Sequence, residues 1–281
     1  MNYAGEIGIG GSATAEASGW GIISFVIPAL NEEGAVGATI KSVPHQKLLR
    51  LGLTSEILVV DNDSMDGTAI EAARAGAVVL TEVRRGYGSA FLKGLTEARG
   101  DILVLCDADG TYPIEDAEAL IRPILEGRAD FVIGSRTKGG IADGAMPWHH
   151  RYIGNPALTW LQNRLFGTRI SDAHCGLRAI SKDAFLALGL ECCGMEFAPE
   201  MLVKAAANRL RIEEAPVTYR PRFAGKPKLR SFRDGWRHLK FLIGAFLRLR
   251  VLAPRGFRLH KDKPSPLMVR EKVEEVDGGK P

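Results

Sequence analysis

Cysteine is scarce in this chain, and its spacing excludes the usual cysteine-based sites. The 281 residues include four cysteines, Cys106, Cys175 and the adjacent pair Cys192 and Cys193. None of these spacings fits a zinc site. Adjacent cysteines do not easily bridge each other, so we expect free thiols, as in a reducing cytosolic compartment.

Long hydrophobic runs and the common phosphate-binding motifs are also missing. The best apolar candidate, Phe241–Leu247, is far shorter than the roughly 18 residues that a membrane span needs, so we expect no transmembrane helix. The first residues lack the basic start and apolar run of a signal peptide. No G-x-x-x-x-G-K-[ST] loop is present and no G-x-G-x-x-G follows the first predicted strand, which excludes a P-loop enzyme and argues against a dinucleotide oxidoreductase.

The composition is that of a folded globular protein, but the charge is unevenly distributed. Hydrophobic residues make up 46% of the chain and charged residues 25%, which excludes a disordered or fibrous protein. The net charge is only +4, yet residues 220–263 hold fourteen Lys and Arg against two acids, a net charge of +12. The remainder has a net charge of −8. Such a basic C-terminal band predicts an anionic surface as partner.

Short apolar runs alternate with helical patterns through the first half of the chain. The predicted strands are residues 22–27, 56–60, 77–80, 101–105 and 130–134, and the helices between them are residues 32–45, 68–75, 87–98 and 114–126. Continuous apolar strands that alternate with helices indicate right-handed βαβ units. The predicted fold class is therefore α/β, a mostly parallel sheet flanked by helices.

The second half is more helical. The pattern predicts helices over residues 155–166, 181–188, 198–208 and 234–250, and a strand over residues 211–220 in which Pro216 favours a sheet edge. We predict a flexible lead (1–20), a catalytic domain (21–230), an amphipathic interfacial helix (231–258) and a disordered tail (259–281).

Polar residues follow the predicted strands at the points where ligands bind in open α/β sheets. They are Asn31 and Glu32 after the first strand, Asp61 and Asp63 after the second, Asp107 and Asp109 after the fourth, and Arg136 after the fifth. In extended Asp107-Ala-Asp109, alternate side chains point the same way. Two carboxylates can then hold one hard cation, Mg²⁺ or Mn²⁺, while a substrate phosphate completes its shell.

An ordered set of motifs over about residues 22–250 resembles the inverting family 2 glycosyltransferases of the GT-A fold. The segments that carry this resemblance are Val26–Glu33, Leu58–Thr68, Arg85–Gly88, Asp107–Gly110, Gly134–Arg136, Asp172–Arg178 and Val217–Leu229. Within that family, the chain is most similar to the dolichol-phosphate and polyprenyl-phosphate mannosyltransferases. The resemblance implies a GT-A nucleotide-binding sheet with a C-terminal amphipathic extension.

The resemblance also implies roles for individual residues. It places Pro28, Asn31, Glu32, Asp61, Asp63, Asp107, Ala108, Arg220 and Lys228 at the nucleotide sugar. Asp107 and Asp109 would hold the metal, and Ala108 would contribute its backbone. Arg136 and Arg151 would bind phosphate and, with Asp109, carry catalysis, and Arg178 would complete the acceptor side.

The expected reaction moves a hexose from a nucleotide sugar to a polyprenyl or dolichyl monophosphate with inversion. GDP-mannose is the first choice of donor and UDP-glucose the second. Relatives that use sugar hydroxyls carry a Glu-Asp pair as general base, whereas this chain has Gly194-Met-Glu-Phe-Ala-Pro-Glu200 at that position. A phosphate monoester, whose second pKa is about 6, is already a nucleophile at pH 7 and needs no strong base.

The basic helix near the C-terminus predicts contact with an anionic membrane surface. Arg233, Arg237 and Lys240 alternate with Trp236 and Phe241, a pattern typical of interfacial helices. We expect a cytoplasmic protein held peripherally on the inner face of the membrane, with no nucleic-acid partner. Two alternatives remain: a related transferase with UDP-glucose and a soluble or glycan hydroxyl acceptor, and a module that binds nucleic acid or another anionic surface.

Two histidine features do not fit these roles directly. Trp148-His-His150 lies in a glycine-rich stretch and is interpreted as part of an acceptor loop that orders on binding, since adjacent histidine side chains diverge too much to share a metal. His174, close to Asp172, is interpreted as a structural turn residue.

Overall fold

The computed structural model describes residues 21–225 and 231–251. The predicted lead (1–20) and tail (259–281) lie outside these residues, as do Lys228 and the end of the predicted interfacial helix.

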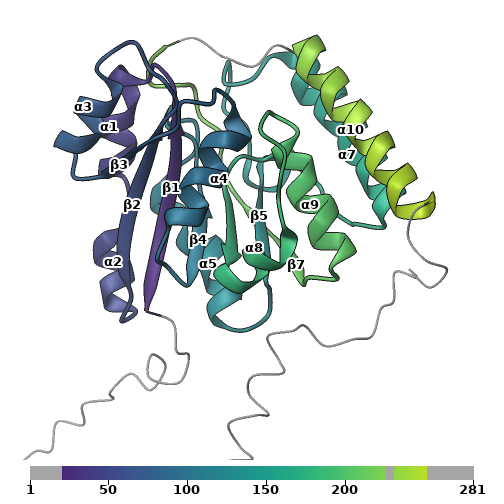
Figure 1. Ribbon diagram of the computed structural model, residues 1–281, viewed down its shortest axis with the longest axis horizontal. Helices are drawn as coiled ribbons and strands as arrows, with labels where there is room; N and C mark the ends of the chain where they lie inside the picture. The colour runs from purple at the N-terminus through teal and green to yellow at the C-terminus, as the bar shows by residue number, and fades with distance from the viewer. Residues whose placement is uncertain (1–20, 226–230, 252–281) are drawn as a thin grey trace, which may run out of the picture.

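Seven strands form one mixed sheet at the centre of the molecule (Figure 1). The strands are β1 (Ile22–Ala29), β2 (Thr54–Asp61), β3 (Val78–Thr81), β4 (Ile102–Leu105), β5 (Phe131–Ser135), β6 (Arg178–Ser181) and β7 (Ile212–Pro216). Their order across the sheet is β3-β2-β1-β4-β6-β5-β7. All neighbours run parallel except β6, which is antiparallel to both β4 and β5. The mostly parallel α/β sheet is therefore confirmed, and Pro216 lies in an edge strand as predicted.

Helices cover the sheet and close one end of it. The helices are α1 (Glu33–Lys41), α2 (His45–Arg50), α3 (Thr68–Arg74), α4 (Tyr87–Glu97), the 3₁₀ turn η1 (Ile114–Asp116), α5 (Glu118–Leu125), α6 (Arg136–Gly139), the π-helical turn η2 (His150–Gly154), α7 (Asn155–Phe166), α8 (Lys182–Leu188), α9 (Phe197–Ala207) and α10 (Ser231–Val251). Helix α4 packs against β1 and β2, and α5 packs against β4 to β7. Helices α7 and α10 lie side by side beyond the β7 end of the sheet (Figure 1).

Three predicted elements differ from the structure for local reasons. The predicted helix over residues 32–45 divides into α1 and α2 because Pro44, whose ring removes a backbone donor, stands at the N-cap of α2. Strand β6 was not predicted. It is four residues long and fully buried, but its sequence, Arg178-Ala-Ile-Ser181, is polar at both ends and gives no apolar run. Beyond residue 216 the chain leaves the sheet, although the prediction continued that strand to residue 220.

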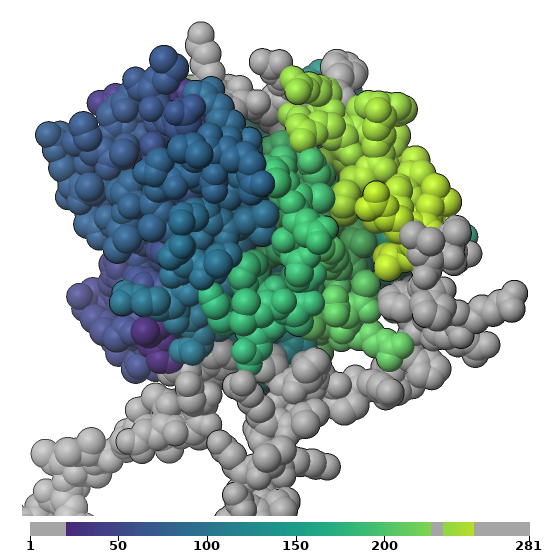
Figure 2. Space-filling model, viewed as in Figure 1, coloured from purple at the N-terminus to yellow at the C-terminus, as the bar shows by residue number. Residues whose placement is uncertain are grey.

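The hydrophobic core is continuous from β3 to β7. Strands β4 and β5 are buried at every position, as expected for parallel strands with both faces covered. A second, small cluster joins α10 to the body, with Leu242 packed against Phe166 and Val203. Figure 2 shows α10 as an exposed ridge beside α9. One face of α10 therefore packs against the body of the protein, and the other faces outward.

Candidate functional site

The carboxyl ends of four strands bring the predicted polar residues to one edge of the sheet. Asn31 and Glu32 follow β1, Asp61 ends β2, Asp107 and Asp109 follow β4, and Arg136 follows β5. Because β1, β2 and β4 are parallel neighbours, their acidic ends meet. The edge predicted from the sequence thus exists as a single region of the fold.

An open cavity of about 350 Å³ lies at the β1 end of this edge. Its lining residues are Asn31, Glu32, Glu33, Gly34, Asp66, Ala224 and Gly225. Asn31 adopts a left-handed backbone conformation (φ 49°), and its side-chain oxygen accepts a hydrogen bond from the Met65 amide (2.7 Å). That bond ties the loop after β1 to the loop after β2. The cavity is therefore lined by the two tied loops together with Ala224 and Gly225.

Asn31 and Glu32 line this cavity, whereas four other residues predicted to recognise the nucleotide, Pro28, Asp61, Asp63 and Ala108, are not among its lining residues. Within the described part of the chain, one buried carboxylate oxygen of Asp61 has no hydrogen-bond partner. Asp63 is exposed and forms an ion pair with Arg85 at 2.8 Å. Pro28 lies within β1 opposite Val60. The carbonyl of buried Ala108 accepts a hydrogen bond from Thr39 (3.0 Å). Asp61 is the member of this set with spare capacity to accept a hydrogen bond.

Asp107 and Asp109 form an acidic pair beside the cavity. Desolvation by the surrounding protein, together with the neighbouring Asp109, raises the pKa of Asp107 to about 7. The Tyr87 hydroxyl donates to one Asp107 oxygen at 3.3 Å. One Asp109 oxygen accepts bonds from the Thr111 amide and hydroxyl. The pair therefore carries more negative charge than the protein around it compensates.

The donor chemistry of this pair fits a divalent cation that is shared with a substrate. Carboxylate oxygens are hard ligands, and Mg²⁺ is commonly held by one or two of them together with substrate phosphates. Across residues 21–225 and 231–251, no group of three or more His, Cys, Asp or Glu side chains is arranged to hold a metal alone. Two protein carboxylates thus leave the remaining positions to water and phosphate.

Arg222 is the basic residue that reaches the acidic pair, and the prediction had not selected it. Its guanidinium contacts Asp109 at 2.7 Å and Glu32 at 3.0 Å. Backbone bonds hold its segment in place, from the Arg220 amide to the Thr111 carbonyl and from the Phe223 amide to the Asp109 carbonyl. Gly110 allows this close approach, since it has a φ of +74° and an added Cβ would meet the Phe223 ring at 2.2 Å. Arg220-Pro-Arg222 placed two basic residues in this segment, but the sequence alone does not distinguish which of them reaches the carboxylates.

Arg220 itself points elsewhere. Its guanidinium forms an ion pair with Glu115 of η1 at 2.9 Å, so the structure places it beside the site and not on the carboxylate pair. Lys228 lies outside the described residues.

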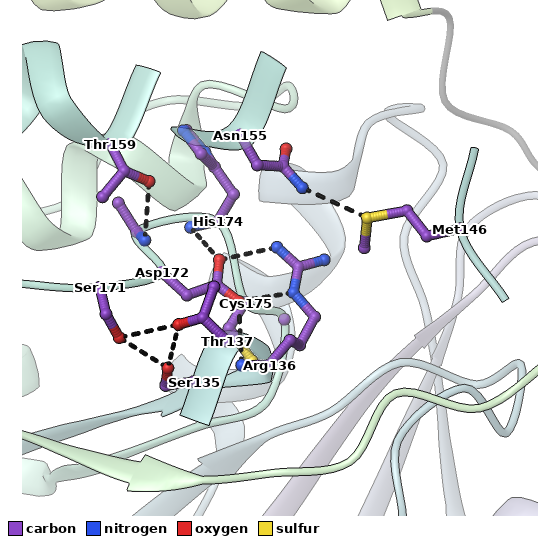
Figure 3. A network of polar contacts seen from close by, with 12 residues as sticks. Ser135, Arg136, Thr137, Met146, Asn155, Thr159, Ser171, Asp172, His174 and Cys175 are labelled. Atoms are coloured by element: carbon purple, nitrogen blue, oxygen red, sulfur yellow. Dashed lines mark hydrogen bonds and ion pairs between the residues drawn. The ribbon is translucent and has the colours of Figure 1, made fainter. Parts of the chain in front are cut away.

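Arg136 is held in place by a buried carboxylate (Figure 3). The Asp172 carboxylate accepts two bonds from the Arg136 guanidinium, at 2.6 and 2.7 Å, and one from its backbone amide at 3.1 Å. The two side chains are only 7% and 3% exposed. Burial opposes ionisation of Asp172, but the bonds and charge of Arg136 outweigh it and lower its pKa. Arg136 is therefore a fixed positive charge at the end of β5.

The other two predicted phosphate or acceptor residues differ from each other. Arg151 lies in η2, and its guanidinium carbon lies over the Tyr152 ring, 5.3 Å from the ring centroid. Arg178 is buried in β6 and donates to the carbonyls of Cys175, Ala198 and Ala173. Burial lowers the pKa of Arg178. Arg151 can thus meet a ligand, whereas Arg178 holds the backbone beneath the site.

Two carboxylates lie at the start of α9, Glu196 at its N-cap and Glu200 in its first turn, and both are engaged. Glu196 forms an ion pair with Arg237 of α10 at 2.9 Å. Glu200 is 2% exposed, accepts bonds from the Glu191 and Cys192 amides, and pairs with Lys204 at 2.9 Å. Both carboxylates therefore stabilise the local structure through these contacts.

His174 is buried next to the Arg136–Asp172 pair. Its ring stacks on the His238 ring with centroids 5.2 Å apart, and within the described chain neither ring nitrogen has a hydrogen-bond partner. Burial, with the nearby His238, lowers the pKa of His174 to about 3. The charged groups that face it are Asp172, which favours its protonation, and Arg136 and Arg178, which oppose it.

This buried imidazole predicts a loss of stability in acid. The unfolded chain binds a proton at this position below pH 6.5, but the folded chain does so only near pH 3. Stability is therefore complete above pH 6.5 and falls by about 1.4 kcal/mol per pH unit between about pH 6 and pH 4. Urea unfolding over this range should show a shallower dependence in His174→Phe than in the wild type. Parallel curves for the two proteins would contradict the assignment of a neutral buried His174.

Comparison with known proteins relates this geometry to one family. Residues 24–189 match the family described as Glycosyl transferase family 2. The chain is 42% identical over 221 residues to the low-salt glycan biosynthesis hexosyltransferase Agl6 of Haloferax volcanii, which covers 79% of this chain and 53% of that protein. It is 31% identical over 216 residues to the dolichol-phosphate mannosyltransferase of Pyrococcus furiosus, covering 74% of this chain and 59% of that one. The chain thus spans little more than half the length of these two relatives.

Solved structures agree on the fold. Glucosyl-3-phosphoglycerate synthase from Mycobacterium tuberculosis, in complex with Mn²⁺, uridine diphosphate and phosphoglyceric acid, superposes with a TM-score of 0.63 at 23% identity. The match covers 81% of this chain and 79% of the synthase. The sheet and its flanking helices are therefore GT-A-like.

Proposed function

The chain belongs to the family 2 glycosyltransferases, and from this premise we propose that it transfers a hexose from a nucleotide sugar to a polyprenyl monophosphate. Mannose from GDP-mannose is the preferred donor group, and the anomeric configuration is inverted. The dolichol-phosphate mannosyltransferase among the relatives supports the choice of acceptor.

The observation that carries this proposal is the engagement of both carboxylates at the start of α9. Glu196 is paired with Arg237, and Glu200 is buried under two backbone amides and Lys204. These pairings oppose a role for either carboxylate as the general base for a sugar hydroxyl, although one Glu196 oxygen forms no hydrogen bond within the described residues. A phosphate monoester with a second pKa near 6 is already ionised at pH 7 and needs no base.

The donor side of the proposed site consists of the cavity and the acidic pair. Asn31, Glu32, Asp61 and Asp63 would bind the nucleoside, and the open acceptor oxygen of Asp61 suits an N–H donor of the base. Asp107 and Asp109 would hold Mg²⁺ or Mn²⁺, which when bound neutralises charge that develops on the departing diphosphate. Arg222, which pairs with Glu32 and Asp109, would supply a positive charge beside the same diphosphate.

The acceptor side consists of fixed and exposed basic groups. Arg136, immobilised by Asp172, offers a positive charge that needs no reorganisation during the reaction. Arg151 lies in a π-helical turn, a feature often found at functional sites. Arg178 supports the loop over residues 173–175 from below. The lipid phosphate would bind between Arg136 and Arg151 and attack the sugar carbon opposite the leaving diphosphate.

The outer face of α7 and α10 supports a peripheral position on the cytosolic face of a membrane. Exposed apolar side chains on these helices and on η2 form this face: Tyr152, Ile153, Trp160, Trp236, Ile243 and Leu247. Exposed Arg233, Lys240 and Arg248 lie among them on α10. Aromatic and basic side chains together are suited to an anionic lipid surface. Within the described residues, no helix is both long and apolar enough to span a membrane.

We expect the double variant Trp160→Ala/Trp236→Ala to lose affinity for anionic vesicles. The two rings are each more than half exposed, and burying large aromatic groups in the lipid interface is favourable, so the partition coefficient should fall about tenfold or more. Co-sedimentation with phosphatidylglycerol-containing vesicles measures this loss. Leu186→Ala, which removes an equally exposed apolar side chain from α8, is the matched control and should bind like the wild type. Equal binding of all three proteins would contradict the membrane face.

A second candidate keeps the fold but uses UDP-glucose and a hydroxyl acceptor. The solved synthase complexes with UDP-glucose and phosphoglyceric acid favour this donor. A nucleic-acid or other anionic-surface module is a third reading, supported by the basic band alone. An assay with GDP-mannose or UDP-glucose, Mg²⁺ or Mn²⁺, and a short polyprenyl phosphate distinguishes them. Sugar label that partitions into organic solvent supports the proposal, whereas a water-soluble glycoside or no product opposes it.

A further inference from the structure

Helix α10 touches the catalytic domain through polar contacts that a membrane anchor alone would not need. Its inward face carries Asp234, His238 and Leu242 at successive helical turns, all buried. Leu242 lies in an apolar cluster with Phe166 and Val203, which is sufficient to dock a helix. His238 and Arg237, one turn earlier, instead contact two loops that lead to the proposed site.

The first contact leads to Arg136. The His238 ring stacks on His174 with an interplanar angle of 11°. The His174 amide donates to Asp172 at 3.3 Å, and the same carboxylate holds the Arg136 guanidinium. A chain of direct contacts thus joins α10 to the fixed charge on the acceptor side.

The second contact leads to Asp107. Arg237 pairs with Glu196, and the His238 Nε2–H donates to the Met195 carbonyl at 2.9 Å. Phe197 follows Glu196 in the sequence. Its ring stacks on the Phe91 ring with centroids 5.5 Å apart, and its centroid lies 6.4 Å from that of the Tyr87 ring. The Tyr87 hydroxyl donates to Asp107. His238 therefore connects α10 to both sides of the reaction centre, and Arg237 adds a second link on the Asp107 side.

The cost of this arrangement indicates that it does more than pack. A buried polar group without a hydrogen-bond partner destabilises a fold, and both ring nitrogens of His174 are in that state within the described chain. Two leucines would fill the same space without this cost. Buried polar groups of this kind call for an explanation beyond stability.

We infer that α10 is a positioning element of the active site, with His238, His174, Arg237 and Glu196 as the positioning residues. Through them the helix fixes the loop over residues 172–178 and the loop over residues 191–197, and so sets Arg136 and Asp107 relative to each other. This inference rests on the proposed function for the identity of the reaction. It goes beyond that function because it gives the proposed membrane-facing helix a role in the chemical step.

The test compares His238→Leu, His238→Gln and Gly244→Ala in the full chain. His238→Leu keeps an apolar side chain against His174 but removes the donor to Met195, whereas His238→Gln restores an N–H donor. Gly244→Ala is the matched control on the same helix, since a Cβ there meets no neighbouring atom within 4 Å. Transfer is measured with a short, water-soluble polyprenyl phosphate, so that membrane binding does not enter.

For His238→Leu we expect kcat to fall at least tenfold while KM for the nucleotide sugar changes less than twofold. His238→Gln should recover most of kcat, and Gly244→Ala should match the wild type. A purely packing role predicts that His238→Leu performs as well as Gly244→Ala, or that His238→Gln is as impaired as His238→Leu. Either result would overturn the inference.

A second measurement separates this inference from the proposed function. Amide hydrogen exchange in residues 172–178 and 191–197 should be faster in His238→Leu and return toward the wild-type rate in His238→Gln. This readout requires no substrate. Unchanged exchange in both loops would overturn the positioning role, whereas a wild-type protein that glycosylates no lipid phosphate would overturn the proposed function alone.

Discussion

Asp109→Asn should lower kcat/KM for sugar transfer about a thousandfold or more. The substitution removes one of the two carboxylates proposed to hold the cation, and loss of a group that stabilises developing charge costs about 10²–10³ in rate even for a single neutral donor. The fold should survive, because the Asn side-chain oxygen can still accept the two bonds from Thr111 that Asp109 accepts. Initial rates at varied Mn²⁺ and Mg²⁺ concentrations measure the effect.

Asp116→Asn is the matched control for this prediction. Asp116 lies in η1, seven residues further along, and its side chain is exposed. It should retain wild-type activity and metal dependence. An Asp109→Asn protein that keeps both would show that the cation, if required, is held elsewhere.

Arg136→Met should abolish transfer and also destabilise the protein. The change leaves Asp172 as a buried carboxylate without its guanidinium, and breaking a buried pair in this way costs about 3–5 kcal/mol. We expect a loss of that size in the free energy of unfolding, measured by urea titration, together with an activity loss of at least about a hundredfold.

The double variant Arg136→Met/Asp172→Asn separates the two effects. Removing the orphaned charge should restore much of the stability, since a buried ion pair replaced on both sides is often near neutral. Activity should remain lost, because the phosphate-binding charge is absent. A double variant that regains both stability and activity would reduce Arg136 to a structural residue.

The strands that could be predicted are those with a distinctive local sequence pattern. Strands β1, β2, β4 and β5 are buried apolar runs that end in polar residues, so their edge of the sheet, with Asp107, Asp109 and Arg136, followed from the sequence. Strand β6 did not, because its sequence, Arg178-Ala-Ile-Ser181, is polar at both ends and shows no apolar run, so it becomes a strand through its pairing with β4 and β5. Such pairing is decided by tertiary packing and not by the four residues themselves.

The residues of the site that could not be predicted depend on the same long-range packing. The Arg136–Asp172 bond crosses 36 positions, and Arg222 reaches Glu32 across 190. Sequence order places neither pair together. The roles of all the predicted site residues stay predictions, and the structure adds that Arg220 pairs with Glu115 while Arg178 is buried.

The acceptor group is the central claim, and one comparison tests it most directly. The wild-type protein is given a labelled nucleotide sugar, a divalent cation, and either a short polyprenyl phosphate or the polyprenol of the same length. With Glu196 and Glu200 both engaged, we predict label in the organic phase with the phosphate and none with the alcohol. Equal or greater transfer to the alcohol, or to a soluble sugar hydroxyl, would contradict the account.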